Sequence, residues 1–425
     1  MDLDGRAVAI LQENDRGGFT IPTRRLYPFQ WNWDSAFCAL GFATFDRDRA
    51  WREIETLFEG QWADGMVPHI IFRRDDPDYF PGPAVWRTPS EPPTSGYSQP
   101  PVVASILRLL MRDGHADDTQ RAGALFDKTL AWHRWFHTYR DPFRRGVIGL
   151  AHPWESGRDN SPDWDESLRA VVVAPDLEPY VRRDLDHVDA SERPHKDEYD
   201  RYLTIVSFGR NAAWDADTIA RRGPFLVADP GLTFILLRAD RDLLALARHL
   251  GRNDAIGEIE AWIAAAEAGA DYLWNEAAHG YCARNMHDEV FSPALTNASM
   301  LAFYAGVGSP AQRTRLAAEA RRISDTVPFL MPSWDPARSE FEPRRYWRGP
   351  IWCVMNFMIA AGFREAGEDA LADRVRQDTA RLIEKAGFYE NFDPTTGNGC
   401  GGADFSWTAA IWLAWASPTQ VAAAA

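Results

Sequence analysis

Two acidic, aromatic-rich loops that lie far apart in the sequence hold the residues best suited to chemistry. The first, His152–Asp165, contains Asp159 among six ionisable side chains, two Trp, one Gly and two Pro, which favours a shaped loop. The second, Phe388–Thr408, contains Glu390. Glycoside hydrolysis needs two carboxyl groups beside the scissile bond, one to protonate the leaving oxygen and one to activate water or attack directly. The two loops therefore predict a glycosidase site, and a solvated surface loop is the alternative interpretation of the first.

Tryptophan is unusually frequent, with 18 residues in the chain. Sugar sites use indole faces as flat apolar platforms, with polar groups at the rim for the hydroxyls. A third stretch, Arg345–Trp352, adds aromatics, and its Arg348 can orient a carboxylate. Core packing and substrate contact are equally good interpretations for each of five indoles: Trp31, Trp33, Trp347, Trp352 and Trp407.

Four blocks of the sequence resemble the signatures of glycoside hydrolase family 63 and stand in the same order as in that family. They are Phe29–Asp34, Trp154–Pro162, Tyr346–Trp352 and Tyr389–Asp393. The trehalases of the same clan have similar blocks. The resemblance covers nearly the whole chain and implies an all-α fold, an (α/α)6 barrel, that hydrolyses α-glycosidic bonds with inversion. It implies that Asp159 is the general acid and Glu390 the general base.

Within this family, the chain is most similar to the small bacterial mannosylglycerate and glucosylglycerate hydrolases. The resemblance implies a sugar subsite made of Tyr27, Trp31, Trp33, Asp34, Gln99, Tyr346, Trp347 and Trp352. It implies an aglycone subsite for the glycerate carboxylate made of His69, Tyr79, Arg193 and Tyr199. We also expect substrate contacts from Trp154, Gly157, Arg348 and Trp407. The stretch Asp184–Asp200 is strongly charged, so a solvated face is its alternative interpretation.

The mechanism makes two physical demands on the carboxyl pair. Asp159 needs a raised pKa to stay protonated near neutrality, and burial beside indoles would provide it. Inversion needs room for a water between the sugar and Glu390, so we expect a carboxyl separation of roughly 6.5–9.5 Å. A separation near 5 Å would instead indicate a retaining enzyme. This chemistry requires no metal and no organic cofactor.

The elements that position these loops are expected to be helices. Apolar residues recur at helical spacing in about a dozen segments, several of them in pairs joined by turns such as 251–254 and 367–369. Short strands are expected only near 146–151 and 289–292. Without a fixed-period repeat, paired helices favour a closed double ring over a solenoid. We expect one catalytic domain over residues 1–420, with cap-like insertions at 61–101 and 176–200, and a frayed tail at 421–425.

Composition limits the partners and the location. The net charge of −15 argues against nucleic acid as a partner. The sequence contains no run of 18 apolar residues, so no membrane span is expected. The four cysteines are isolated, and no signal peptide is evident at the start, so we expect a cytoplasmic protein, which can be a homo-oligomer. The expected partner is a small sugar substrate.

Three weaker signals do not carry a function. Gly397–Gly402 formally contains GxGxxG but follows a turn and not a strand, which argues against a dinucleotide site. His133 and His137 have the spacing of zinc ligands without a third candidate nearby, so packing is the preferred interpretation. The acidic cluster Asp75–Asp78 lies in a Pro-rich loop and is expected to be solvated.

Alternative functions differ in class. The first is a trehalase-like or oligosaccharide α-glucosidase, in which a second sugar replaces the anionic aglycone. The second is a non-catalytic sugar-binding protein, in which one carboxylate would be misplaced. A helical cyclase or lyase acting on isoprenoids would need Asp-rich motifs on helices, which the sequence lacks. The choice between glucose and mannose and the identity of the aglycone stay open at this point.

Overall fold

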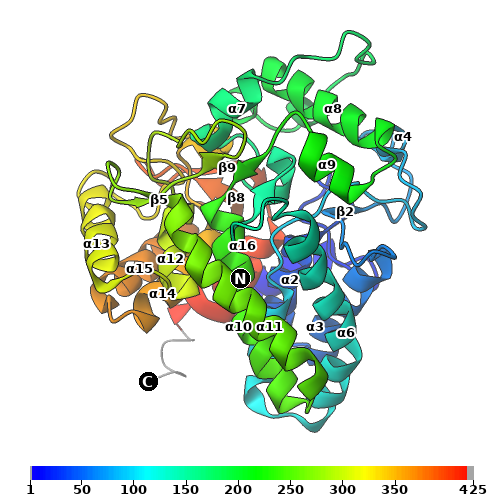
Figure 1. Ribbon diagram of the computed structural model, residues 1–425. Helices are drawn as coiled ribbons and strands as arrows, with labels where there is room; N and C mark the ends of the chain where they lie inside the picture. Colours follow the sequence, from blue (N-terminus) through cyan, green and yellow to red (C-terminus); the bar gives the residue numbers. More distant parts are fainter. Residues whose placement is uncertain (1, 419–425) are drawn as a thin grey trace.

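The computed structural model describes residues 2–418, and the tail expected at 421–425 lies outside them. Helices dominate, as the periodicity predicted (Figure 1). The α-helices are α1 Leu3–Asn14, α2 Asn32–Phe42, α3 Arg47–Leu57, α4 Pro83–Trp86, α5 Val103–Leu110, α6 Ala116–Tyr139, α7 Asp165–Arg169, α8 Lys196–Asn211, α9 Ala216–Arg222, α10 Pro230–His249, α11 Asn253–Gly269, α12 Leu301–Ala305, α13 Pro310–Ser324, α14 Cys353–Glu365, α15 Asp369–Ala386 and α16 Ser406–Ile411. The prediction of an all-α fold is confirmed.

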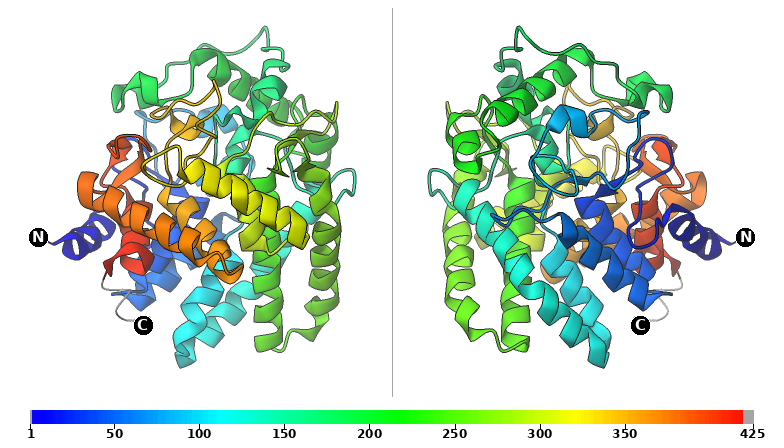
Figure 2. Two further views of the ribbon diagram at one scale, coloured as in Figure 1. Left: turned by 90° about the vertical axis from the view of Figure 1, so that its left-hand side faces the viewer. Right: turned by 90° about the vertical axis from the view of Figure 1, so that its right-hand side faces the viewer.

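Six helices contact one another in a closed succession. α2 packs on α5, α5 on α10, α10 on α12, α12 on α14, α14 on α16, and α16 again on α2. Further helices pack outside them: α1 on α16, α3 on α2, α11 on α10 and α15 on α14. Figure 2 shows α10 and α11 as a long antiparallel pair that reaches to the lower end of the molecule. No helix of residues 2–418 is both long and apolar enough to cross a membrane.

The turns between paired helices follow from local chemistry. Gly251 and Gly367 have φ values of +70° and +79°, which glycine adopts without strain, and each separates two paired helices as predicted. At the start of α10, the Asp229 carboxylate accepts a hydrogen bond from the Leu232 amide over 2.9 Å, and Pro230 occupies the first turn. The Asp229 carboxylate also binds Arg158 in the loop His152–Asp165, which we call the acid loop.

The two ends of the described chain pack together. The indole of Trp412 donates a hydrogen bond to Asp4 Oδ1 over 2.6 Å, which joins α1 to the segment that follows α16. α16 itself continues as a π-helical turn over Trp412–Ala416, so the helix expected at 406–417 changes its winding after Ile411. The first helix is therefore tied to the last one from outside the ring.

Short antiparallel strands lie between the helices. They are β1 Gln30–Trp31, β2 Ile70–Ile71, β3 Gly149–Leu150, β4 Val227–Ala228, β5 Trp274–Asn275, β6 Gly280–Tyr281, β7 Arg284–Asn285, β8 Tyr389–Phe392 and β9 Gly399–Ala403. β1 pairs with β2, β3 with β4, β4 with β7, β5 with β6, and β8 with β9. The strand predicted near 146–151 is present as β3. The prediction near 289–292 was wrong, because only Phe291 forms an isolated bridge there, and strands were also missed elsewhere, the longest of them in the hairpin β8–β9. Its glycines have low strand propensity, which hid it in the sequence.

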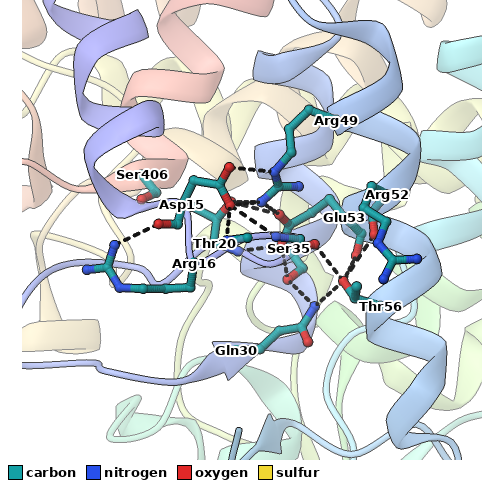
Figure 3. Close-up of polar contacts among 12 residues, drawn as sticks. Asp15, Arg16, Thr20, Gln30, Ser35, Arg49, Arg52, Glu53, Thr56 and Ser406 are labelled. Atoms are coloured by element: carbon teal, nitrogen blue, oxygen red, sulfur yellow. Dashed lines mark hydrogen bonds and ion pairs between the residues drawn. The ribbon is translucent and has the colours of Figure 1, made fainter.

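A buried carboxylate fixes the first aromatic block. Glu53 on α3 is fully buried and accepts hydrogen bonds from the amide and hydroxyl of Thr20 and from the hydroxyl of Ser35. Arg49 neutralises it at 2.7 Å (Figure 3). Gln30 donates to Ser35 over 3.1 Å within the same network. The start of α2 and the block before it are therefore tied to α3 by buried hydrogen bonds and an ion pair and not only by packing.

The two segments expected to be insertions line the same cavity as the loops that carry Asp159 and Glu390. In 61–101, β2 pairs with β1, and the amide of His69 donates to the Tyr97 carbonyl over 2.8 Å. In 176–200, short 3₁₀ turns over Asp184–Asp186 and Ala190–Glu192 precede α8. The chain between α7 and α8 runs across the top of the molecule in Figures 1 and 2.

Candidate active site

One cavity brings together all but three of the predicted site residues. The predicted residues that line it are Tyr27, Trp31, Trp33, Asp34, His69, Tyr79, Gln99, Trp154, Gly157, Asp159, Arg193, Tyr199, Tyr346, Glu390 and Trp407. Segments more than 300 residues apart in the sequence therefore meet at one site.

Three buried ion pairs hold the acid loop in shape. Arg140, at the end of α6, binds Glu155 with its Nη2 atom 2.7 Å from Oε1. Arg158 binds Asp163 at 3.0 Å and Asp229, the cap of α10, at 2.6 Å. Removing either partner of such a pair would leave a buried charge uncompensated, so these residues fix the backbone on both sides of the loop's centre.

Asp159 lies between these anchors. Its backbone carbonyl accepts hydrogen bonds from the Trp164 indole and the Tyr202 hydroxyl, each over 2.9 Å. Gly157, with φ of +67°, passes so close to Trp33 that a Cβ atom would lie 2.6 Å from its Cζ2. Burial raises the pKa of Asp159 to about 7, although the charge of Arg193 lowers it. A carboxyl group with this pKa can be protonated near neutrality and can therefore act as a general acid.

Glu390 lies at a bulge of the hairpin β8–β9, where the register shifts between Tyr389 and Asn391. Its Oε1 accepts a hydrogen bond from the Tyr27 hydroxyl over 3.0 Å, and its Oε2 accepts one from the Gly402 amide over 3.1 Å. Burial raises the pKa of Glu390, while Arg193 and these donors oppose the rise. The two carboxyl groups thus have different surroundings, and only Glu390 is held through both oxygens by donors that stabilise its charged form.

Arg193 is the buried cation closest to the pair. Its Nε lies 3.0 Å from Asp184, its Nη1 donates to the Tyr27 hydroxyl over 2.8 Å, and the same Nη1 is 3.9 Å from Glu390 Oε1. Its guanidinium also lies over the ring of Tyr346, 4.3 Å from the centroid. An Arg in this place can bind an anionic group of a substrate and can stabilise the ionised base.

Indoles and polar groups form the inner wall of the cavity. Trp33 stands edge to face with Trp407 at 5.8 Å, and its amide donates to Gln99 Oε1 over 3.4 Å. Burial, together with the charge of Glu390, raises the pKa of Asp34 well above its usual range. A neutral Asp34 carboxyl can both donate and accept hydrogen bonds to sugar hydroxyls, and the indole faces can contact the ring.

The predicted aglycone residues come from both insertions. Tyr79 packs edge to face on Trp31 at 5.6 Å, and Tyr199 on Trp154 at 6.0 Å. Burial lowers the pKa of His69 to about 3, so its imidazole is neutral near pH 7. His69 can therefore donate a hydrogen bond to a carboxylate but brings no charge, which leaves Arg193 as the positive group of the four.

Three predicted residues do not line the cavity. Trp347 and Trp352 are buried and stack on each other at 3.8 Å, with Trp347 behind Trp33. Arg348 binds Asp165 through two nitrogens, each at 2.8 Å. The carboxylate that Arg348 orients is thus Asp165, at the end of the acid loop, and all three residues support the site from behind.

Charged residues that were not predicted also line the cavity. They are Arg25, Asp78, Arg183, Asp184 and His187. All five residues lie in stretches without helical periodicity. The sequence favoured a solvated face for Asp184–Asp200, because an ion pair such as Asp184 with Arg193 is visible only in three dimensions. The nearest available signal was the density of alternating charges in this stretch.

The discounted signals have structural explanations. His133 and His137 both bind the buried carboxylate of Asp240, at 2.7 and 2.9 Å. They join α6 to α10, as the packing interpretation predicted. The glycine-rich stretch Gly397–Gly402 belongs largely to β9 and lies against Glu390.

Comparisons with known proteins agree with this geometry. A family model described as "Mannosylglycerate hydrolase MGH1-like glycoside hydrolase domain" matches residues 27–408. The chain is 47% identical to a mannosylglycerate hydrolase of Thermus thermophilus, over 96% of this chain and 99% of that protein. It is 34% identical to a glucosylglycerate hydrolase of Mycolicibacterium hassiacum, over 97% of each. A crystal structure of a family 63 mannosylglycerate hydrolase from Thermus thermophilus, in complex with Tris and D-glycerate, superposes with a TM-score of 0.94 at 47% identity, covering 97% of this chain and 100% of that one.

Proposed function

Because the chain belongs to the family of mannosylglycerate hydrolase MGH1-like glycoside hydrolases, we propose that it cleaves mannosylglycerate or glucosylglycerate to the free sugar and glycerate. The membership confirms the family and the hydrolase class predicted from the four sequence blocks. The observation that carries the substrate proposal is a single cavity with two carboxyl groups, Asp159 and Glu390, and a buried cation, Arg193.

In the proposed mechanism, Asp159 protonates the glycosidic oxygen and Glu390 takes a proton from the attacking water. The pKa of about 7 supports Asp159 as the acid. The donors on both oxygens of Glu390 support its role as the ionised base, because they favour the carboxylate. Attack by water on the opposite face of the ring inverts the anomeric centre. Exo-acting cleavage is part of the proposal.

The leaving glycerate is proposed to lie between the two insertions. Arg193 supplies the charge for its carboxylate, and Tyr79, Tyr199 and the neutral His69 supply hydrogen bonds. The arginine already has Asp184 as a partner, so the glycerate carboxylate would share or displace that ion pair. The sugar is proposed to lie deeper, against Trp33, Asp34 and Gln99.

The architecture proposed for this enzyme is an (α/α)6 barrel in one domain over residues 1–420. The closed succession of contacts among α2, α5, α10, α12, α14 and α16, with paired helices outside, supports it. Segments 61–101 and 176–200 are proposed as caps over the funnel, since both contribute to the cavity wall. A cytoplasmic location is part of the proposal, supported by four buried, unpaired cysteines. A homo-oligomer stays a prediction.

The alternatives make different demands on the same cavity. A trehalase-like or oligosaccharide α-glucosidase would place a neutral sugar against Arg193, which would leave a buried cation without an anionic partner from the substrate. A non-catalytic sugar-binding protein would not need the pKa of Asp159 raised to about 7. Both are therefore less well supported than glycerate release.

A hydrolysis panel on the purified protein tests the proposal, with the released anomer followed by proton NMR. The panel holds glucosylglycerate, mannosylglycerate, trehalose, glucosylglycerol and short α-gluco-oligosaccharides. We expect fast cleavage of a glycerate glycoside with the β-anomer appearing first. Cleavage only of neutral substrates would reject the glycerate subsite, and no cleavage at all would favour the sugar-binding alternative.

A further inference from the structure

The hairpin β8–β9, which carries Glu390, is held by a carboxylate that lies 209 residues earlier in the sequence than its partner Gly401. Glu192 ends the 3₁₀ turn Ala190–Glu192, within the proposed cap 176–200, and is only 7% exposed. Its Oε2 accepts a hydrogen bond from the amide of Gly401 on β9 over 2.8 Å. The next amide along β9, that of Gly402, donates to Glu390 Oε2 over 3.1 Å. Two consecutive peptide groups thus link the cap to the general base.

The backbone of β9 comes very close to the proposed base at this point. Gly401 has φ of +71°, and a Cβ atom there would lie 2.3 Å from Glu390 Oε2. The strand therefore passes directly against the carboxylate, and the direction of the Gly402 amide depends on how Gly401 is held. A short hairpin of glycines is intrinsically flexible, so an external contact is needed to fix it.

Glu192 also joins this strand to the loop that carries Tyr346. Its Oε1 accepts a hydrogen bond from Arg344. One residue further along each segment, Arg345 donates to the Arg193 carbonyl over 3.0 Å. Arg193 in turn donates to Tyr27, whose hydroxyl binds the other oxygen of Glu390. Both oxygens of the base are thus connected to neighbouring residues of the cap, Glu192 and Arg193.

We propose that Glu192 is a positioning residue for the general base: with the cap seated, its hydrogen bond to Gly401 aims the Gly402 amide at Glu390. The inference rests on the catalytic role proposed above for Glu390. It assigns the cap a second task besides covering the substrate, because a displaced cap leaves the Gly402 amide without the contact that aims it at Glu390. The base is then fully assembled only with the cap in the position described here.

The test compares Glu192→Ala with Glu192→Gln, which keeps an acceptor oxygen for the Gly401 amide. Without the Gly402 donor, the ionised form of Glu390 is less favoured and the pKa of Glu390 rises. In the Ala variant we therefore expect the acid limb of kcat/KM to move to higher pH and kcat to fall about tenfold or more. The Gln variant should restore most of kcat and the position of the limb. Glu178→Gln is the matched control, because Glu178 is a cap carboxylate that binds Arg87, away from the hairpin.

Each other outcome overturns the proposal. An Ala variant with a raised KM but an unchanged kcat and acid limb would limit Glu192 to holding the cap. Equal losses in both variants, with thermal unfolding unchanged, would assign the effect to the charge facing Arg344 and not to the hydrogen bond. The assays use whichever α-glycoside the wild type cleaves fastest in the panel, so failure of the glycerate proposal leaves this test intact.

Discussion

The hydroxyl of Tyr27 donates a hydrogen bond to Glu390 over 3.0 Å. The same hydroxyl oxygen accepts a hydrogen bond from Arg193 over 2.8 Å. Tyr27 therefore links the guanidinium of Arg193 to the carboxylate of Glu390. Tyr27 lies just before the first sequence block, Glu390 lies in the last block, and Arg193 lies in the proposed cap between them. Three segments therefore surround the proposed base, and its pKa can be changed without replacing Glu390 itself.

Replacing Tyr27 with Phe should raise the pKa of Glu390. Without the hydroxyl, the ionised form of Glu390 loses a hydrogen-bond donor, so Glu390 is protonated up to a higher pH and the acid limb of kcat/KM moves to higher pH. We expect kcat to fall about tenfold, the loss that one hydrogen bond to a charged group causes. Rate profiles against pH measure both effects. Tyr139→Phe, at the end of α6, is the control, and a coincident acid limb in Tyr27→Phe and the wild type would contradict the prediction.

Neutral replacements of the two carboxyl groups should separate binding from turnover. Asp159→Asn cannot protonate the leaving oxygen and Glu390→Gln cannot accept a proton from water, so each should lower kcat by at least about a thousandfold. Calorimetry on each variant measures the dissociation constant of the substrate. This value should stay within about tenfold of the dissociation constant of the product sugar from the wild type. A variant that turns over at a near-normal rate would remove that residue from the mechanism.

The sequence predicted the site better than the path of the chain around it. Asp159, Glu390 and the indoles stand in compact blocks of unusual composition, so local signals identified them. Helices α10 and α15 were equally clear, because apolar spacing and glycine at the following turn agree. Most residues that line the cavity were therefore available from the sequence.

What the sequence missed depends on contacts over long distances. Whether an indole faces the cavity or its back wall is decided by packing, and Trp347 and Trp352 turned out to form the layer behind Trp33. The hairpin β8–β9 is stabilised by pairing and by the close approach of Glu390, which outweigh the poor strand propensity of its glycines. Ion pairs such as Asp184 with Arg193 leave no pattern in the sequence.

The alkaline side of the activity profile should report Asp159. Burial raises its pKa to about 7, and the protonated form is the active one, so kcat/KM should fall as pH rises through about 7. Arg193 lowers this pKa through its charge, so Arg193→Ala should move the alkaline limb to higher pH while it weakens substrate binding. Stopped assays across the range on both proteins suffice. A flat alkaline limb in the wild type would mean that another group donates the proton.

The buried pair of Arg140 and Glu155 should be a main source of stability for the acid loop. Both side chains are almost inaccessible, at 1% and 0%, and Glu155 Oε2 also accepts the Ala151 amide over 2.8 Å. Arg140→Met would leave this carboxylate charged and unpaired, so we expect the free energy of unfolding to fall by about 3–5 kcal/mol in denaturant titrations. Arg134→Met on α6, which breaks an exposed pair with Glu258 of α11, should cost less than about 1 kcal/mol. Similar small losses in the two variants would show that water reaches Glu155, and the loop would then depend on Arg158 and its two carboxylate partners instead.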